Sequence, residues 1–194
     1  MTYKSYSPQG SPGLIPPHGN YRELKSYQTA TIIYDFTVAF CDLYMTYKTN
    51  KSPRTYDQMV QAARSGKQNI PEACMASGTS KKTELKLIGV ARASLEELLQ
   101  DYEDYLRQHN LPLWGKTHAS AQAIRALAYT PNRSYMTYRS YVDNPESAAN
   151  CAICLIHQAN YLLDQQLRTL EAEFLEKGGF TERLYHARRQ TRGL

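Results

Sequence analysis

Apolar residues recur at intervals of three and four along several long stretches of this sequence, and that periodicity constrains the fold more than any other feature. The stretches cover residues 24–48, a segment that starts at Thr55, residues 81–108 and residues 145–177. Such spacing places the apolar side chains along one side of a helix. No segment alternates apolar and polar residues between turn signals, as hairpin strands do. The sequence therefore predicts an all-α fold, an up-down four-helix bundle with one short extra helix at residues 117–129.

The two ends of the chain differ in composition from the segment between them. Residues 1–20 contain four prolines and three glycines, which cannot be accommodated in a regular helix. Gly178 and Gly179 are typical of a helix end. We therefore expect a Pro/Gly-rich tail over residues 1–20, the bundle over residues 21–177 and a basic C-terminal suffix over residues 178–194. Both ends are expected to be extended tails.

Pro71 falls inside the second apolar stretch, where its missing amide leaves a carbonyl oxygen one turn earlier without a hydrogen-bond donor. Together with Gly66, this proline predicts a kink or a break between residues 67 and 71. Such a junction would display Arg64 and Lys67 on the surface.

Composition excludes several classes of protein. The chain has 194 residues, and 42% of them are hydrophobic, which is enough for a core and excludes a fully disordered chain. No apolar run reaches the ~18–20 residues that span a bilayer, so a transmembrane protein is excluded. Four cysteines are too few for a disulfide scaffold in a chain of this length, and we expect reduced thiols in a cytoplasmic protein.

The motifs of common metal sites and enzymes are missing. Cys151, Cys154 and His157 lie close together along one predicted helix, but no fourth zinc ligand is near them. The Glu-x-x-His pair of di-metal bundles does not occur, nor does a Walker loop or an HExxH motif. We therefore expect no metal, no cofactor and no enzymatic activity, and we interpret the two cysteines as small core residues.

Basic residues are concentrated in particular segments of a chain whose net charge is +5. Residues 177–194 carry five basic and one acidic side chains, whereas residues 146–176 carry one basic and five acidic ones. Basic loops and a basic tail on a helical body are typical of a protein that binds RNA or DNA, although ordinary surface residues give the same counts. The candidate phosphate-binding residues are Arg64, Lys67, Lys81, Lys82, Arg125, Arg133, Arg139, Arg188, Arg189 and Arg192.

Two further patterns each leave two interpretations open. Arginines and tyrosines alternate over residues 133–141, where the tyrosines could stack on nucleobases or anchor a loop on the body. Arg92 and Asn160 fall within apolar rows, and Glu96 lies four residues after Arg92. This structural polar seam could fix the register between helices or subunits, or it could lie at the edge of the apolar stripe and reach water.

Residues 64–98 carry a recurring family pattern. It consists of Ser65, an Asn-Ile-Pro-Glu segment at 69–72, a Ser-Lys-Lys turn at 80–82 and Ala-Arg-Ala-Ser-Leu-Glu-Glu at 91–97. With this pattern the chain resembles the four-helix-bundle family first noticed as proteins encoded in intervening sequences of large-subunit rRNA genes. That family also includes the accessory variability determinant of diversity-generating retroelements.

The resemblance extends over about residues 24–177, and the segment beyond it looks like the C-terminal suffix of one subgroup. It implies a cytoplasmic bundle that forms a ring-like homopentamer. The retroelement members bind nucleic acid and a reverse transcriptase through basic surfaces. Pro71 before the glutamate and Ala73 in place of the usual glycine depart from the family pattern.

Taken together, these patterns predict a non-enzymatic, oligomeric bundle that binds nucleic acid through basic patches, largely independently of sequence. The alternative is a protein-interaction scaffold, or an accessory subunit of a nucleic-acid enzyme such as a reverse transcriptase. The tyrosines at 27, 34, 44 and 47 give the first helix more aromatic surface than one bundle core needs, and we expect the surplus to be buried between subunits.

Overall fold

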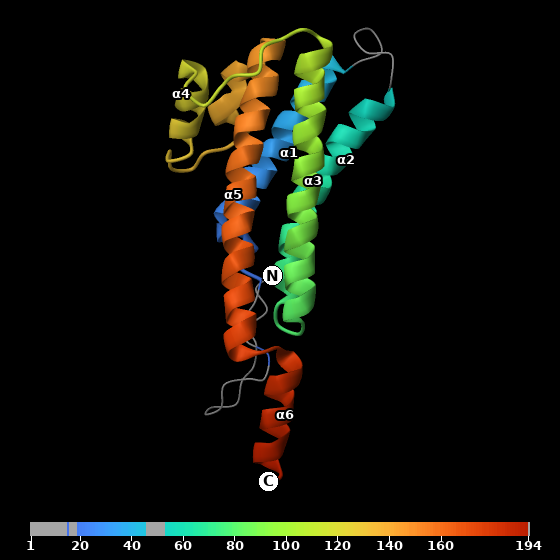
Figure 1. The fold of residues 1–194 in the computed structure, drawn as a ribbon, viewed down its shortest axis with the longest axis vertical. Helices are drawn as coiled ribbons and strands as arrows, with labels where there is room; N and C mark the ends of the chain where they lie inside the picture. Colours follow the sequence, from blue (N-terminus) through green and yellow to red (C-terminus); the bar gives the residue numbers. More distant parts are fainter. Residues whose placement is uncertain (1–14, 16–18, 46–52, 194) are drawn as a thin grey trace.

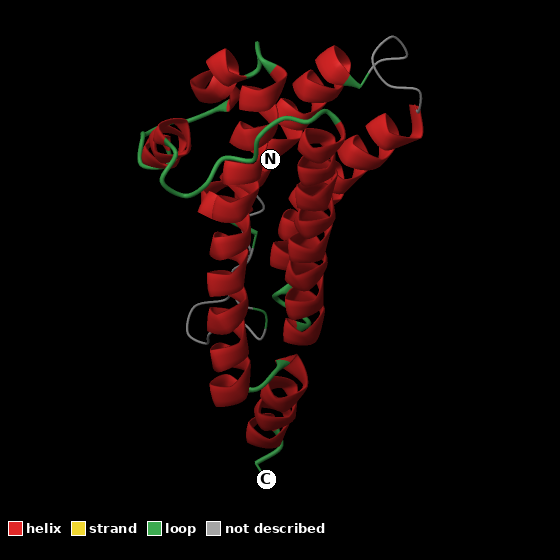
Figure 2. Ribbon diagram, turned by 45° about the horizontal axis from the view of Figure 1, so that its top comes forward, coloured by secondary structure: helices red, strands yellow, loops and turns green. Residues whose placement is uncertain are grey.

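The computed structural model describes residue 15, residues 19–45 and residues 53–193 (Figure 1). This described part is helical and contains no strand, so the all-α prediction is confirmed (Figure 2). Most of the predicted tail over residues 1–20 lies outside the described residues. The elements are the 3-10 helices η1 (Tyr21–Glu23) and η2 (Tyr135–Tyr141), and the α-helices α1 (Lys25–Tyr44), α2 (Pro53–Ala76), α3 (Lys81–Gln108), α4 (Ala119–Leu127), α5 (Pro145–Lys177) and α6 (Phe180–Thr191).

Four of these helices, α1, α2, α3 and α5, pack against one another, and we call them the helical body. α3 contacts both α2 and α5, and α1 also contacts α2 and α5. In Figure 1, α3 and α5 lie side by side and run in opposite directions. Phe36, Phe40, Leu95, Tyr102 and Ile156 are fully buried in the core between them. This burial supplies the main driving force for the fold.

The ends of the long helices carry side chains that cap the backbone. Ser80 Oγ accepts from the Thr83 amide at the start of α3 (3.2 Å), and Asn144 Oδ1 accepts from the Ser147 amide at the start of α5 (3.1 Å). Gly178 follows α5 with a φ of 66°, a conformation that glycine adopts without steric cost. The predicted end of the last long helix is therefore confirmed.

α2 is an uninterrupted α-helix through Pro71, so of the predicted kink or break between residues 67 and 71 the break is wrong. Ile70 and Ala73, on either side of the proline, are both fully buried against the core. This packing holds the helical turn in place although one backbone hydrogen bond is lost. Arg64 is exposed as expected, whereas Lys67 is half-buried.

The connection between α3 and α5 is fixed to the helical body by specific contacts. The Trp114 amide donates to Asn150 Oδ1 (2.7 Å), and the Trp114 indole Nε1 donates to Glu146 Oε1 (2.7 Å). Farther along the connection, the Tyr44 hydroxyl donates to the Val142 carbonyl oxygen (2.6 Å). α4 packs on α5. These contacts hold α4 and η2 beside the first half of α5.

The C-terminal suffix is not an extended tail, because residues 180–191 form helix α6 beyond the end of α5 (Figure 1). The Gly179 amide donates to Glu182 Oε2 (2.9 Å) and so satisfies one of the free amides at the start of the helix. Backbone hydrogen bonds lower the pKa of the Glu182 carboxyl, as expected for an acidic group at this position.

Within the described part of the chain, no helix has both the length and the apolar content that a membrane crossing requires.

Candidate nucleic-acid interface

The structure brings five of the predicted phosphate-binding residues into two separate groups. Arg188 and Arg189 lie on the last turn of α6, and Arg192 directly follows the helix. We call these three residues the α6 arginines. Arg125 lies in the last turn of α4, and Arg133 follows that helix in the sequence. Both side chains line a cleft next to α5. The remaining five residues belong to neither group.

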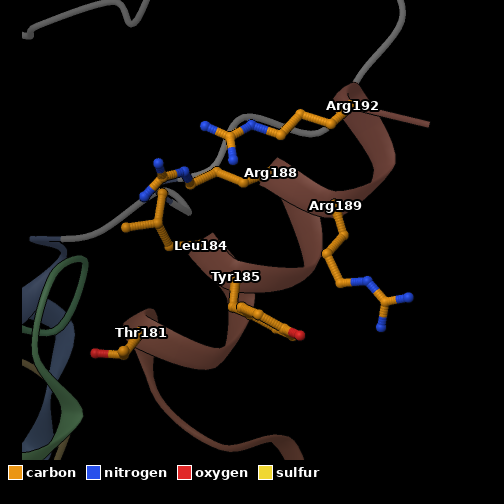
Figure 3. Close-up of a pocket in the computed structure, with 6 residues that line it drawn as sticks. All are labelled: Thr181, Leu184, Tyr185, Arg188, Arg189 and Arg192. Carbon is orange, nitrogen blue, oxygen red and sulfur yellow. The ribbon is translucent and has the colours of Figure 1, made fainter. Parts of the chain in front are cut away.

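The α6 arginines are all exposed and have no ion-pair partner among the described residues. With Thr181, Leu184 and Tyr185 they line a surface hollow of about 480 Å³ (Figure 3). Arg188 and Arg192 extend from one side of the helix, and Arg189 extends from another side together with Tyr185. The Arg189 guanidinium lies 5.9 Å from the centre of the Tyr185 ring.

The geometry of the α6 arginines suits the backbone of a nucleic acid. Each guanidinium presents several N–H donors in a planar fork, which matches the oxygen atoms of a phosphate. The one carboxylate of α6, that of Glu182, is bonded to the Gly179 amide at the other end of the helix. The positive charge at the last turns is therefore available to a partner.

The second group lies in what we call the cationic cleft, which has a volume of about 390 Å³. Its cations are Lys25 at the start of α1, Arg125 in α4 and Arg133 after α4. Arg125 donates to the backbone carbonyl oxygen of Lys116. No carboxylate is among the described residues that line this cleft.

Of the other five predicted residues, three contact a carboxylate or an aromatic ring, and two lie away from both groups. Lys81 Nζ is paired with Glu84 (2.9 Å) and Glu173 (3.6 Å). Arg139 is paired with Asp143 (3.2 Å), and the Lys67 ammonium lies 4.5 Å from the centre of the Tyr34 ring. Arg64 and Lys82 are exposed and lie outside both groups.

The tyrosines of residues 133–141 anchor the connection on the helical body. Tyr138 is fully buried, and the Tyr135 ring packs edge-on against Phe36 with 6.2 Å between ring centres. Tyr141 also packs against the core. The interpretation that Tyr138 stacks on nucleobases is therefore wrong, because its ring faces are covered by protein.

Two exposed tyrosines that the sequence analysis did not single out line the cationic cleft. Tyr129 is 91% exposed and Tyr161 is 64% exposed. Tyr161 falls outside the apolar rows of its helix, and this position is the signal that could have marked it as a surface residue.

The polar seam joins α3 to α5. Arg92 donates to Glu96 Oε2 (2.6 Å) and to Asp164 Oδ1 (3.1 Å), and Asn160 Nδ2 donates to Glu96 Oε2 (3.1 Å). Burial alone would lower the pKa of the Arg92 guanidinium, but its hydrogen bonds and the nearby carboxylates raise it. Asn160 is buried, whereas Arg92 and Glu96 lie at the edge of the apolar stripe and also reach water.

No family model, curated protein or solved structure matches the chain. Three polar residues of α2 and α3 lie close together. Ser65 Oγ and Ser94 Oγ form a hydrogen bond between α2 and α3 (2.8 Å), and Asn69 Nδ2 donates to the Ser65 carbonyl oxygen (2.8 Å). Gly66 is buried beside this cluster. The Ser65–Ser94 hydrogen bond thus links the two helices.

One carboxyl group in the second half of α3 has a strongly raised pKa. Asp101 lies between Glu97 and Asp104 along this helix. Burial and the two neighbouring carboxylates raise the pKa of Asp101 from 3.8 to about 6. Ionisation of this carboxyl therefore costs more in the folded protein than in the unfolded chain.

Asp101→Asn is expected to stabilise the protein at about pH 8 by about 1 kcal/mol, a value reduced for solvent screening of a partly exposed group. The folded state binds the Asp101 proton more tightly, so the native protein loses stability as the pH rises from about 4 to about 6, and the variant escapes this loss. Urea unfolding at about pH 4 and about pH 8 measures the difference. A gain of equal size at both pH values would contradict the assigned pKa shift.

Proposed function

We propose that the protein is a non-enzymatic, oligomeric nucleic-acid-binding protein that contacts RNA or DNA through cationic surfaces. The observation that carries this proposal is the group of α6 arginines, which are exposed, adjacent and free of carboxylate partners among the described residues. The cationic cleft supplies a second positive surface. Two such surfaces favour a long polyanion as the partner.

The proposed mechanism is contact with phosphates. Arginine side chains on the surface hold the backbone of a nucleic acid without reading the bases. No base-reading motif was found in the sequence, so binding is proposed to be largely independent of sequence. Each neutralised phosphate releases counterions, and affinity should therefore fall steeply as the salt concentration rises.

We further propose that α1, α2, α3 and α5 form an up-down four-helix bundle that assembles as a homopentamer in the cytoplasm. The resemblance stated above supports this assembly. The surplus of tyrosines on α1 does not, because Tyr27 packs on Tyr21, Tyr34 on Lys67 and Tyr44 on Phe40 within one chain. Tyr47 lies outside the described residues. Light scattering that gives about 22.2 kDa at micromolar concentration would reject the pentamer.

The alternative is that the protein serves as an interaction scaffold, or as an accessory subunit of a reverse transcriptase. Such a partner would cover exposed apolar side chains such as Leu175 and Met75. Binding to a reverse transcriptase without any binding to oligonucleotides would favour this alternative.

Fluorescence anisotropy with labelled single-stranded and double-stranded oligonucleotides tests the proposed function. Binding should be strongest at about 50 mM salt and should weaken toward about 200 mM, with a slope of ~0.7–0.9 in log K against log salt for each phosphate contacted. Oligonucleotides of unrelated sequence should bind with similar affinity. No binding to any of them at the lowest salt concentration would reject the proposal.

A further inference from the structure

The cationic cleft holds positive charge that the protein itself does not neutralise. Arg133 Nη2 donates to Thr29 Oγ1 (2.6 Å), and its Nη1 lies 3.3 Å from Gln158 Oε1 and 3.4 Å from the Tyr138 hydroxyl. All three of these acceptors are neutral. The side chain is therefore fixed in place while its charge remains unpaired, which is the arrangement expected of an anion-binding group.

Arg125 and Lys25 add two more cations to the same cleft. Burial raises the pKa of the Cys154 thiol, and the nearby charge of Arg125 partly opposes this rise. No ion pair of Arg125 or Lys25 exists among the described residues. Three cations around one cleft favour a ligand with a multiply charged group such as a phosphate.

The cleft also presents aromatic surface. Tyr129 and Tyr161 line it, and neither ring contacts another ring or a cation in the described part of the chain. Exposed tyrosine rings with free faces can stack on the planar base of a nucleotide. A ligand that combines a planar ring with a phosphate would use both the tyrosines and the cations.

A polar group and the size of the cleft agree with such a ligand. The Gln158 side chain lines the cleft, and its Nε2 is a buried donor that has no acceptor among the described residues. A ligand oxygen that accepted from this donor would relieve the cost of leaving it unpaired. The volume of about 390 Å³, with an adjoining hollow that shares Lys25, Tyr129 and Arg133, lies in the range of small-ligand sites.

We infer that the cationic cleft binds one phosphorylated nucleoside, whose phosphate is held by Lys25, Arg125 and Arg133 and whose base contacts Tyr129 and Tyr161. The inference goes beyond the proposed function, because it does not need the α6 arginines. A free nucleotide and the 5′-phosphorylated end of a strand offer the cleft the same chemistry.

Isothermal titration calorimetry of the full chain with AMP tests the inference. Saturable binding of one AMP per chain is expected, and adenosine and inorganic phosphate should each bind at least about tenfold more weakly because each lacks half of the contacts. Arg125→Gln and Tyr161→Ser should each weaken AMP binding by about tenfold. If Arg125→Gln disturbs the fold, Lys25→Gln replaces it as the cation variant, because Lys25 is exposed.

The control variant replaces all three α6 arginines with glutamine and should leave AMP binding unchanged. This control separates the two proposals, since its oligonucleotide binding should be weaker and less dependent on salt while AMP binding stays the same. Displacement of AMP by a trinucleotide, with and without a 5′ phosphate, distinguishes the two sources of the ligand. If the phosphorylated trinucleotide displaces AMP better, the cleft binds a strand end. If neither trinucleotide displaces AMP, the cleft binds the free nucleotide. Absence of saturable AMP binding at millimolar concentration, or unchanged affinity in Arg125→Gln and Tyr161→Ser, would overturn the inference.

Discussion

Gly66→Val is expected to destabilise the protein by about 3 kcal/mol, because this glycine lies where α2 packs closely on Leu95 of α3. A Cβ atom at Gly66 would lie 2.6 Å from Leu95 Cδ2 and 2.7 Å from Leu95 Cγ. Leu95 is fully buried in a close-packed core, so its side chain can move only by displacing its neighbours. Gly89→Val is the matched control, since a Cβ at Gly89 meets no atom within 4 Å. That change should alter stability by less than about 0.5 kcal/mol.

Urea unfolding of the single and double variants measures whether Gly66 and Leu95 are in contact. Leu95→Ala alone should cost about 2 to 5 kcal/mol because it leaves a cavity. In the Gly66→Val background the same change should cost at least about 1 kcal/mol less, since the valine occupies part of that space. Strictly additive costs would contradict the close packing of the two residues.

The long helices could be predicted from the sequence because their signals are local. Apolar spacing identifies each buried face, and the residue types at Ser80 and Asn144 cap helices wherever they occur. Gly66 and Pro71 have the same local signal as a helix break, yet α2 continues through both. The close approach of Leu95 and the burial of Ile70 decide this outcome, and both depend on tertiary packing. Periodicity within one segment carries no information about such contacts.

The candidate site was harder to predict because the partners of charged residues are distant in the sequence. Lys81 is paired with Glu173, and Arg133 is fixed by Thr29, which lies 104 positions away. Composition shows how many cations a segment has, but only the fold shows which of them are neutralised. The contact of Glu182 with the Gly179 amide contributes to the helical state of the C-terminal suffix. Counting prolines and glycines does not reveal this contact.

Replacement of Arg188, Arg189 and Arg192 by glutamine is expected to produce the largest change in nucleic-acid affinity of any substitution considered. Three phosphate contacts contribute roughly 2 to 3 to the slope of log K against log salt. When the salt concentration rises from about 50 to about 200 mM, the affinity of each protein falls by some factor. That factor should be roughly 20- to 40-fold larger for the unmodified protein than for the variant. The three side chains are exposed, so the fold should be unaffected.

A matched control removes three exposed cations elsewhere, with Arg54, Lys86 and Arg168 replaced by glutamine. It lowers the net charge by the same amount and leaves the α6 arginines in place. If general charge alone caused binding, this control and the α6 variant would weaken it equally.

The salt dependence of oligonucleotide binding, measured by fluorescence anisotropy for the full chain, the α6 variant and the matched control, is the most direct test. The unmodified protein and the control should have similar steep slopes, and the α6 variant should have a slope smaller by roughly 2 to 3. Equal slopes for all three proteins, or no binding by any of them at about 50 mM salt, would contradict nucleic-acid binding through the α6 arginines.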